Sequence, residues 1–336
     1  KHCLLTHQLK LSTPGFYRVE CVVQAAGNVG VKLSRFIGYR PGQIRVPLTR
    51  EADFDDFWRQ TLAELAKIRP EFSLHRRKSL DSTTHEVYEV AMRSLGRVRV
   101  RGWYEKPKTP GGVAALLRVP GYGQDMRPTG SSSPLAVFSF NIRGHGNSQE
   151  DVPGRPQNYW IRGLDDKHGY FYQGAYADCV RAVDFLASRK EVDVKRIGVT
   201  GGSQGGGLSI AAAALDKRIS VCAPDIPFLC DWVKYFKASK WPEMDRWIAA
   251  DPKRSWPATL RTLSYFDTLN MADRVRCPVL VSIGVQDAVC PPSTIYAVFN
   301  RFAGGKEIRV YPEAKHYVPA KHRVLSQRWL TRHLIP

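Results

Sequence analysis

Alternation of apolar and polar positions marks the beginning of the chain as β structure. Residues 16–25 and 31–39 both alternate, and the turn-rich stretch 26–30 separates them, which predicts a β-hairpin. Two strands do not make a stable domain alone. We therefore expect the hairpin to be the end of a β-sandwich whose other strands are absent, or an extension that leans on a main domain. The proline-bracketed stretch 40–47 is the expected linker.

The chain from residue 48 onward alternates between predicted strands and predicted helices. A stripe of apolar residues predicts a helix from residue 54 that stops before Pro70. The remaining predicted elements are strands at 86–93, 97–104, 113–119, 134–142, 196–200, 277–285 and 307–312, and helices at 175–188, 209–215 and 319–334. This order predicts a doubly wound, mostly parallel α/β sheet. We expect one domain over 48–336, with an aromatic-rich lid inserted near 225–266, and a separate N-terminal β segment over 1–47.

The glycine-rich stretch VTGGSQGGGL at 199–208 lies between a predicted strand and a predicted helix. It lacks the lysine of a phosphate-binding Walker loop, and it fits a dinucleotide-binding fingerprint poorly. It does match Gly-x-Ser-x-Gly through Gly201, Ser203 and Gly205. In that motif, a sharp strand-to-helix turn exposes the serine hydroxyl, and the glycines remove Cβ atoms that would collide. Ser203 is the predicted nucleophile.

A serine nucleophile needs a base, and the base needs a carboxylate to orient it. On this fold the acid and then the histidine follow the serine along the chain. Asp287 comes just after the predicted strand 277–285, and His316 comes just after the strand 307–312. The predicted triad is therefore Ser203, Asp287 and His316. The backbone N–H groups of Tyr122 and Gln204 are the predicted oxyanion hole.

Charge and cysteine content narrow the function classes further. The formal net charge of the 336 residues is +19, but we find neither a basic helix nor an RNA-stacking motif, so we expect no nucleic-acid partner. In RVRVR at 97–101 the arginines alternate with valines, which predicts a half-buried strand with a solvated basic face. The seven cysteines form no CxxC pair, so we expect neither a disulfide scaffold nor a metal site. No apolar run approaches the length of a membrane helix, and no membrane partner is expected.

Several segments resemble the acetyl xylan esterase and cephalosporin C deacetylase family, carbohydrate esterase family seven. The resemblance covers roughly residues 50–334 and is carried by FDDFW at 54–58, GVTGGSQGGGL at 198–208, DIPFLCD at 225–231, RTLSYFDTLN at 261–270, CPVLVSIGVQDAVCPPSTIYAVFN at 277–300 and KEIRVYPEAKH at 306–316. It implies an α/β-hydrolase that removes acetyl groups from sugar hydroxyls of acetylated xylan or xylo-oligosaccharides, without a cofactor. It also implies a small acyl pocket walled by Pro227, Phe228 and Leu229, and assembly as a homo-oligomer, from dimer to hexamer.

The sequence departs from this family at two positions near the predicted site. His145 follows Arg143-Gly144, where the family usually has glutamine, and Tyr317 follows His316, where the family usually has glutamate. Neither departure touches the predicted triad, although both could alter the hydrogen bonds around it. Appended β pieces are more typical of secreted bacterial members, so a secreted or periplasmic location is favoured over a cytoplasmic one. The compartment and what precedes Lys1 stay open.

Other functions remain open at this point. One alternative is a broad carboxylesterase for small acyl groups or a cephalosporin C deacetylase. Another is an inactive hydrolase fold that serves as a binding module.

Overall fold

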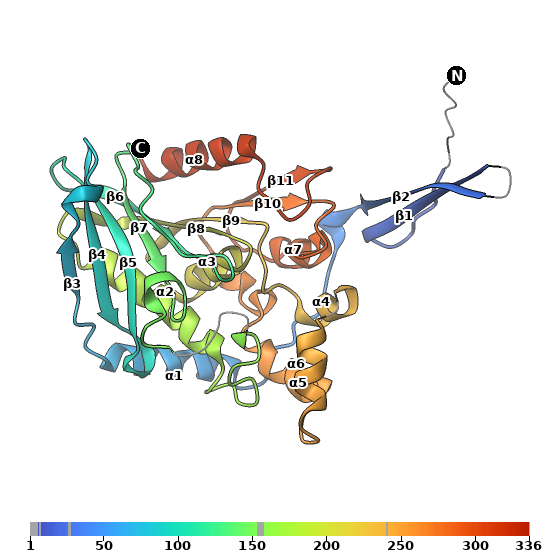
Figure 1. Cartoon of the computed structure of the whole chain (residues 1–336), viewed down its shortest axis with the longest axis horizontal. Coiled ribbons are helices and arrows are strands. Elements are labelled where there is room, and N and C mark those ends of the chain that lie inside the picture. The colour runs from blue at the N-terminus through green and yellow to red at the C-terminus, as the bar shows by residue number, and fades with distance from the viewer. Residues whose placement is uncertain (1–5, 7, 26–27, 153–157, 240, 336) are drawn as a thin grey trace.

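A nine-stranded sheet forms the centre of the molecule (Figure 1). The computed structural model describes residues 6, 8–25, 28–152, 158–239 and 241–335. Across the sheet the strands follow the order β11-β10-β9-β8-β6-β7-β5-β4-β3. Their bounds are β3 Ser73–Arg76, β4 His85–Arg93, β5 Arg99–Pro107, β6 Val113–Arg118, β7 Ala136–Asn141, β8 Val192–Gly202, β9 Ile219–Asp225, β10 Val279–Gly284 and β11 Lys306–Tyr311.

The strand directions confirm the predicted, mostly parallel sheet. Strands β6 to β11 pair in parallel with one another, whereas β3, β4 and β5 add an antiparallel edge beside β7. The central strands β7 and β10 are buried at every position, as expected for strands that are covered on both faces. In such a sheet the carboxyl ends of the parallel strands meet along one edge, and ligands bind in the crevice there.

Helices cover both faces of the sheet (Figure 1). Their bounds are α1 Phe54–Lys67, α2 Phe171–Ala187, α3 Gln204–Leu215, α4 Trp232–Ala238, α5 Pro242–Ala249, α6 Trp256–Ser264, α7 Pro292–Phe299 and α8 Ala320–Leu334. Helix α8 packs Trp329, Leu330 and Leu334 against one face, where they form a core with strand residues such as Val221 and Leu280. The larger core lies on the opposite face, under α1, α2, α3 and α7. Among the described residues, no helix combines the length and apolar character needed to cross a bilayer.

The predicted N-terminal hairpin is present as β1 (Gly15–Ala25) and β2 (Asn28–Tyr39), which form a separate two-stranded antiparallel sheet. Residues 26 and 27 of the predicted turn lie outside the described residues, as does Cys3. The hairpin projects away from the main body (Figure 1). Near its base, the side chain of Gln286 accepts a hydrogen bond from Phe36 N at 2.9 Å and donates one to Phe36 O at 3.1 Å. Phe16 also packs against Tyr296 of α7, with ring centroids 5.6 Å apart.

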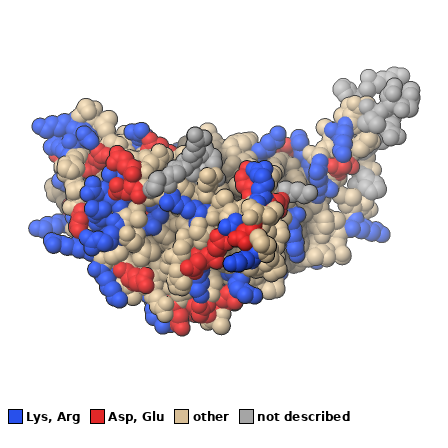
Figure 2. Space-filling model, turned by 60° about the horizontal axis from the view of Figure 1, so that its bottom comes forward, with Lys and Arg blue, Asp and Glu red and all other residues tan. Residues whose placement is uncertain are grey.

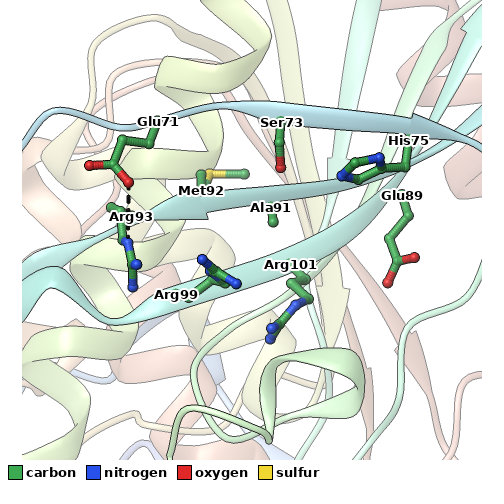
Figure 3. A pocket seen from close by; sticks show the side chains of 9 residues that line it. All are labelled: Glu71, Ser73, His75, Glu89, Ala91, Met92, Arg93, Arg99 and Arg101. Atoms are coloured by element: carbon green, nitrogen blue, oxygen red, sulfur yellow. Dashed lines mark hydrogen bonds and ion pairs between the residues drawn. The ribbon is translucent and has the colours of Figure 1, made fainter.

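Residues 99–101 of the basic alternation form the predicted kind of strand. In β5, Val100 is buried while Arg99 is exposed and Arg101 is half-buried. Figure 3 shows these two arginines beside a cavity of about 380 Å³ at the β3–β5 edge. Glu71 and Glu89 also line this cavity, and Figure 2 shows acidic side chains among the basic ones on the face that it displays.

The structure also corrects the element boundaries. Helix α2 begins at Phe171 rather than at 175, and β5 begins at Arg99 rather than at 97, because a short 3-10 turn occupies Leu95–Arg97. The edge strand β3 was not predicted. It has only four residues, of which His75 and Arg76 are exposed, and so short a segment carries little hydrophobic pattern.

Candidate active site

Ser203 stands at the junction between β8 and α3, at the carboxyl edge of the sheet. Its backbone has φ 56° and ψ −118°, a strained conformation for a residue with a Cβ atom. The closeness of neighbouring backbone atoms explains why glycines flank Ser203. A Cβ atom on Gly201 would lie 2.7 Å from Gly205 O, and one on Gly205 would lie 2.5 Å from Val119 O. The sharp turn therefore requires both glycines, as the motif predicts.

The three predicted side chains form one hydrogen-bonded chain. His316 Nε2 lies 3.1 Å from Ser203 Oγ, and His316 Nδ1 lies 2.9 Å from Asp287 Oδ2. A carboxylate can only accept, so Nδ1 carries the proton and Nε2 is left to accept the serine proton. Asp287 Oδ1 accepts the N–H groups of Val289 and Cys290 at 2.8 and 2.9 Å. The buried carboxylate is thereby fixed in place, whereas the His316 side chain keeps 29% of its surface exposed.

A buried thiol, which the sequence analysis did not single out, adjoins this chain. Cys290 Sγ lies 3.9 Å from Ser203 Oγ, and Asp287, Cys290 and His316 offer possible metal-ligand atoms within 4.8 Å of one another. The carboxylate and the imidazole of this group are already bonded to each other, and burial raises the pKa of the Cys290 thiol. A protonated thiol is a poor metal ligand, so this arrangement suits proton transfer better than metal binding. The position of Cys290, three residues after Asp287, is the signal that could have found it.

The two predicted oxyanion donors belong to two segments that meet at this turn. Gln204 is the first residue of α3, where backbone N–H groups have no partner within the helix. Tyr122 lies in the loop 119–135 that follows β6. That loop contacts the turn directly, because the Cβ position of Gly205 faces the carbonyl oxygens of Val119 and Pro120.

His145 is hydrogen-bonded to both of these segments. Its Nδ1 lies 3.2 Å from the carbonyl oxygen of Arg143, so Nδ1 must donate. Its Nε2 then accepts from Gly123 N at 3.3 Å and from the side-chain nitrogen of Gln204 at 3.1 Å. The ring is fully buried, and burial lowers its pKa to about 4. His145 is therefore a neutral acceptor at neutral pH.

The predicted acyl-pocket residues lie directly after β9. Phe228 N donates to the carbonyl oxygen of Ser203 at 2.9 Å, which brings this segment against the turn. The Phe228 ring is 5% exposed and packs edge-on against Trp160, with centroids 4.7 Å apart. Leu229 has no exposed surface, and its side chain packs behind α3 at Gly207. Of this pair, Phe228 is the one whose ring lies among the lid aromatics, next to Trp232 and Tyr235.

Comparison with known proteins agrees with this geometry. A family model described as acetyl xylan esterase matches residues 31–333. Acetyl esterase Axe7A of Xylanibacter ruminicola is 29% identical over 338 positions, which cover 96% of this chain and 75% of that protein.

Solved structures support the same assignment. An acetyl xylan esterase from Paenibacillus sp. R4 superposes with a TM-score of 0.81 at 33% identity, over 88% of this chain and 99% of that one. Acetyl xylan esterase 1 from Thermoanaerobacterium sp. JW/SL YS485 superposes with a TM-score of 0.81 at 28% identity, over 88% of this chain and 98% of that one. The chain is thus a carboxylic ester hydrolase with an α/β-hydrolase fold, and it belongs to the acetyl xylan esterase family.

Proposed function

We propose that this protein removes acetyl groups from acetylated carbohydrate of the xylan type through a covalent acyl-enzyme. The observation that carries the proposal is the continuous chain from Ser203 through His316 to Asp287, with distances of 3.1 and 2.9 Å. The relatives named above are acetyl and acetyl xylan esterases. Their names suggest the acyl group and the carbohydrate.

In the first half of the reaction, His316 Nε2 takes the hydroxyl proton of Ser203 while Oγ attacks the ester carbonyl carbon. The carbonyl oxygen becomes an oxyanion, for which the N–H groups of Tyr122 and Gln204 are the proposed donors. Asp287 stabilises the imidazolium that forms. When the tetrahedral intermediate collapses, His316 returns the proton to the departing sugar oxygen. Acetyl-Ser203 remains.

In the second half, water attacks the acetyl carbonyl carbon and His316 takes one of its protons. A second oxyanion forms at the same place. Its collapse breaks the bond to Ser203 Oγ, which recovers its proton from His316, and acetic acid leaves as acetate. Every proton passes over the one imidazole, so this sequence requires no cofactor.

The acyl specificity, the domain division and the assembly are further parts of the proposal. Phe228, together with Pro227 and Leu229, is proposed to wall a pocket for a small acyl group. Residues 1–47 are proposed to be a segment distinct from the hydrolase domain 48–336, with 225–266 as its lid. The family resemblance suggests a dimer or hexamer, which light scattering on the purified protein measures.

Fluorophosphonate labelling with peptide mapping, together with acetate release from acetylated xylo-oligosaccharides, tests the function. We expect label on Ser203, and loss of both label and acetate release in Ser203→Ala and His316→Ala. His75→Ala is the matched control, because His75 lies on the opposite edge strand of the sheet. Preference for long-chain acyl esters would indicate a broad carboxylesterase. Absence of turnover of any activated acetyl ester would indicate a binding module.

A further inference from the structure

The loop 119–135 leaves part of one sheet face uncovered. Parallel neighbours such as β6 and β7 are usually joined by a helix that packs on the sheet. Here the connection contains no helix, and all of its residues are described. Loops of this length without secondary structure are uncommon in compact domains, and they often serve a function. A cavity of about 680 Å³ lies between this loop, the strands and α8, a volume typical of small-molecule sites.

The cavity reaches the candidate active site through three of its loops. Gln124 lies two residues after Tyr122, Gly202 precedes Ser203, and Tyr317 follows His316, and all three line the cavity. The opening is thus continuous with the loops that hold the proposed nucleophile, base and oxyanion donor. A group that occupied it would lie beside the loops of the candidate active site, between them and α8.

The lining offers both hydrogen-bond donors and acceptors over an apolar base. Leu116, Val137 and Leu330 form part of the base. Arg118 Nη1 donates to Ser139 Oγ at 2.8 Å, and no other hydrogen bond of this guanidinium is found among the described residues. Asp225 binds Ser282 and His322 through Oδ1 alone, which leaves Oδ2 as an acceptor.

The rim of the cavity is held in place before any ligand arrives. The carboxylate of Glu105 has no exposed surface. It accepts the N–H and hydroxyl groups of Thr129 at 2.8–2.9 Å and the N–H of Ser131 at 3.1 Å. This fixes the serine-rich stretch 131–133. On the other side of the opening, Tyr317 leaves 52% of its surface exposed, and an exposed ring of this kind can stack on the apolar face of a sugar.

We propose that this cavity binds the glycosyl residue next to the acetylated sugar, with the Tyr317 ring packed against that residue. The inference rests on the function proposed above and adds a binding subsite to it. Hydroxyl-rich ligands need donors and acceptors together with an apolar surface, which is the combination found here. A purely lipidic group would offer no partner to the remaining N–H groups of Arg118 or to Asp225 Oδ2, at a cost in free energy.

Filling the cavity tests the inference. Ser132 is an exposed rim residue whose side chain makes no hydrogen bond among the described residues, so Ser132→Trp adds bulk without breaking the rim. Ser132→Ala is the matched control. The measurement is kcat/KM for acetylated xylotetraose divided by kcat/KM for p-nitrophenyl acetate, which lacks a sugar. We expect the ratio to fall at least tenfold in Ser132→Trp and in Tyr317→Ala, and less than twofold in Ser132→Ala.

A direct binding measurement provides the second readout. Ser203→Ala protein should bind deacetylated xylotetraose in a calorimetric titration, and the Ser203→Ala/Ser132→Trp double variant should bind it at least tenfold more weakly. Unchanged ratios in Ser132→Trp and Tyr317→Ala, together with unchanged binding in the double variant, would overturn the subsite while leaving the esterase function intact. Wild-type protein that hydrolyses neither substrate would instead overturn the function proposed above. Melting temperatures identify a variant that fails to fold. If either Ser132→Trp or Tyr317→Ala fails to fold, the remaining one of these two variants tests the subsite.

Discussion

The side-chain nitrogen of Gln204 lies 3.1 Å from Nε2 of His145. The same Nε2 accepts the N–H of Gly123, next to Tyr122. The Gln204 amide is fixed at its other end by the Tyr172 hydroxyl, which donates to Oε1 at 2.8 Å. One imidazole thus links the two segments that carry the proposed oxyanion donors, at a position where the family usually has a glutamine.

The first prediction concerns the pH dependence of stability. The pKa of folded His145 is about 4, below the ordinary value of 6.5, so between these values the unfolded chain binds more protons. The contribution of neutral His145 to the free energy of unfolding is fully present above about pH 6.5 and is lost as the pH falls toward 4. We expect the free energy of unfolding to drop by up to about 3 kcal/mol over that range on this account.

Denaturant unfolding at several pH values measures this drop, and His145→Gln provides the comparison. Glutamine has no proton to gain in this range, so the variant should show a shallower pH dependence. Equal slopes for the two proteins would contradict the assignment of His145 as a buried neutral acceptor.

The second prediction concerns the glycines around Ser203. In Gly205→Ala the new Cβ would meet Val119 O at 2.5 Å and Pro120 O at 3.1 Å. The loop of Tyr122 must then move. We expect at least about a hundredfold loss of kcat, comparable to removal of one oxyanion donor, and a lower melting temperature. In Gly202→Ala the Cβ meets nothing within 4 Å, so its melting temperature should match the wild type. Equal melting temperatures in both variants would argue against a close-packed turn.

The third prediction concerns acyl size. The Phe228 ring packs on Trp160 and Trp241 beside the turn, and Phe228→Ala would open space there. We expect the ratio of kcat/KM for p-nitrophenyl butyrate to that for p-nitrophenyl acetate to rise about tenfold. This is the size of effect expected when the pocket can accommodate the additional methylene groups of the butyryl chain. Leu229→Ala, behind α3, should destabilise the protein without this change in preference. An unaltered ratio in Phe228→Ala would place the acyl pocket elsewhere.

The fourth prediction concerns Gln286, the residue before Asp287. Its side chain makes two hydrogen bonds with Phe36 of the hairpin and donates a third to Pro312 O at 2.8 Å. We expect Gln286→Ala to lose about 1–3 kcal/mol of stability and to lower kcat, because the loops of Asp287 and His316 lose a shared contact. Gln149→Ala is the control, since the Gln149 side chain makes no hydrogen bond among the described residues. A loss of stability with unchanged kcat would limit Gln286 to anchoring the hairpin.

The fold and the chain of three side chains were predictable because each follows from a local pattern. Apolar runs identified buried strands such as β7 and β10, although not β9 (Ile219–Asp225), and the glycines around Ser203 identified the turn. Asp287 and His316 then followed from the order of residues after strands. The network around His145 was not predictable, because it depends on three loops meeting in space. The cavity beside Tyr317 results from an absent helix, and a loop without a hydrophobic pattern gives no sign of what it leaves uncovered.

The hydrogen bonds between Gln286 and the hairpin also affect how the N-terminus of this enzyme can be truncated or fused to another domain. Removal of the N-terminal strands would expose the Gln286 amide to water and would remove two of the three side-chain hydrogen bonds that hold the residue before Asp287. Shortened versions would then turn over substrate more slowly even though every reacting group is retained. An engineer who fuses a carbohydrate-binding module to this hydrolase should therefore keep residues 15–39 and attach the module ahead of them.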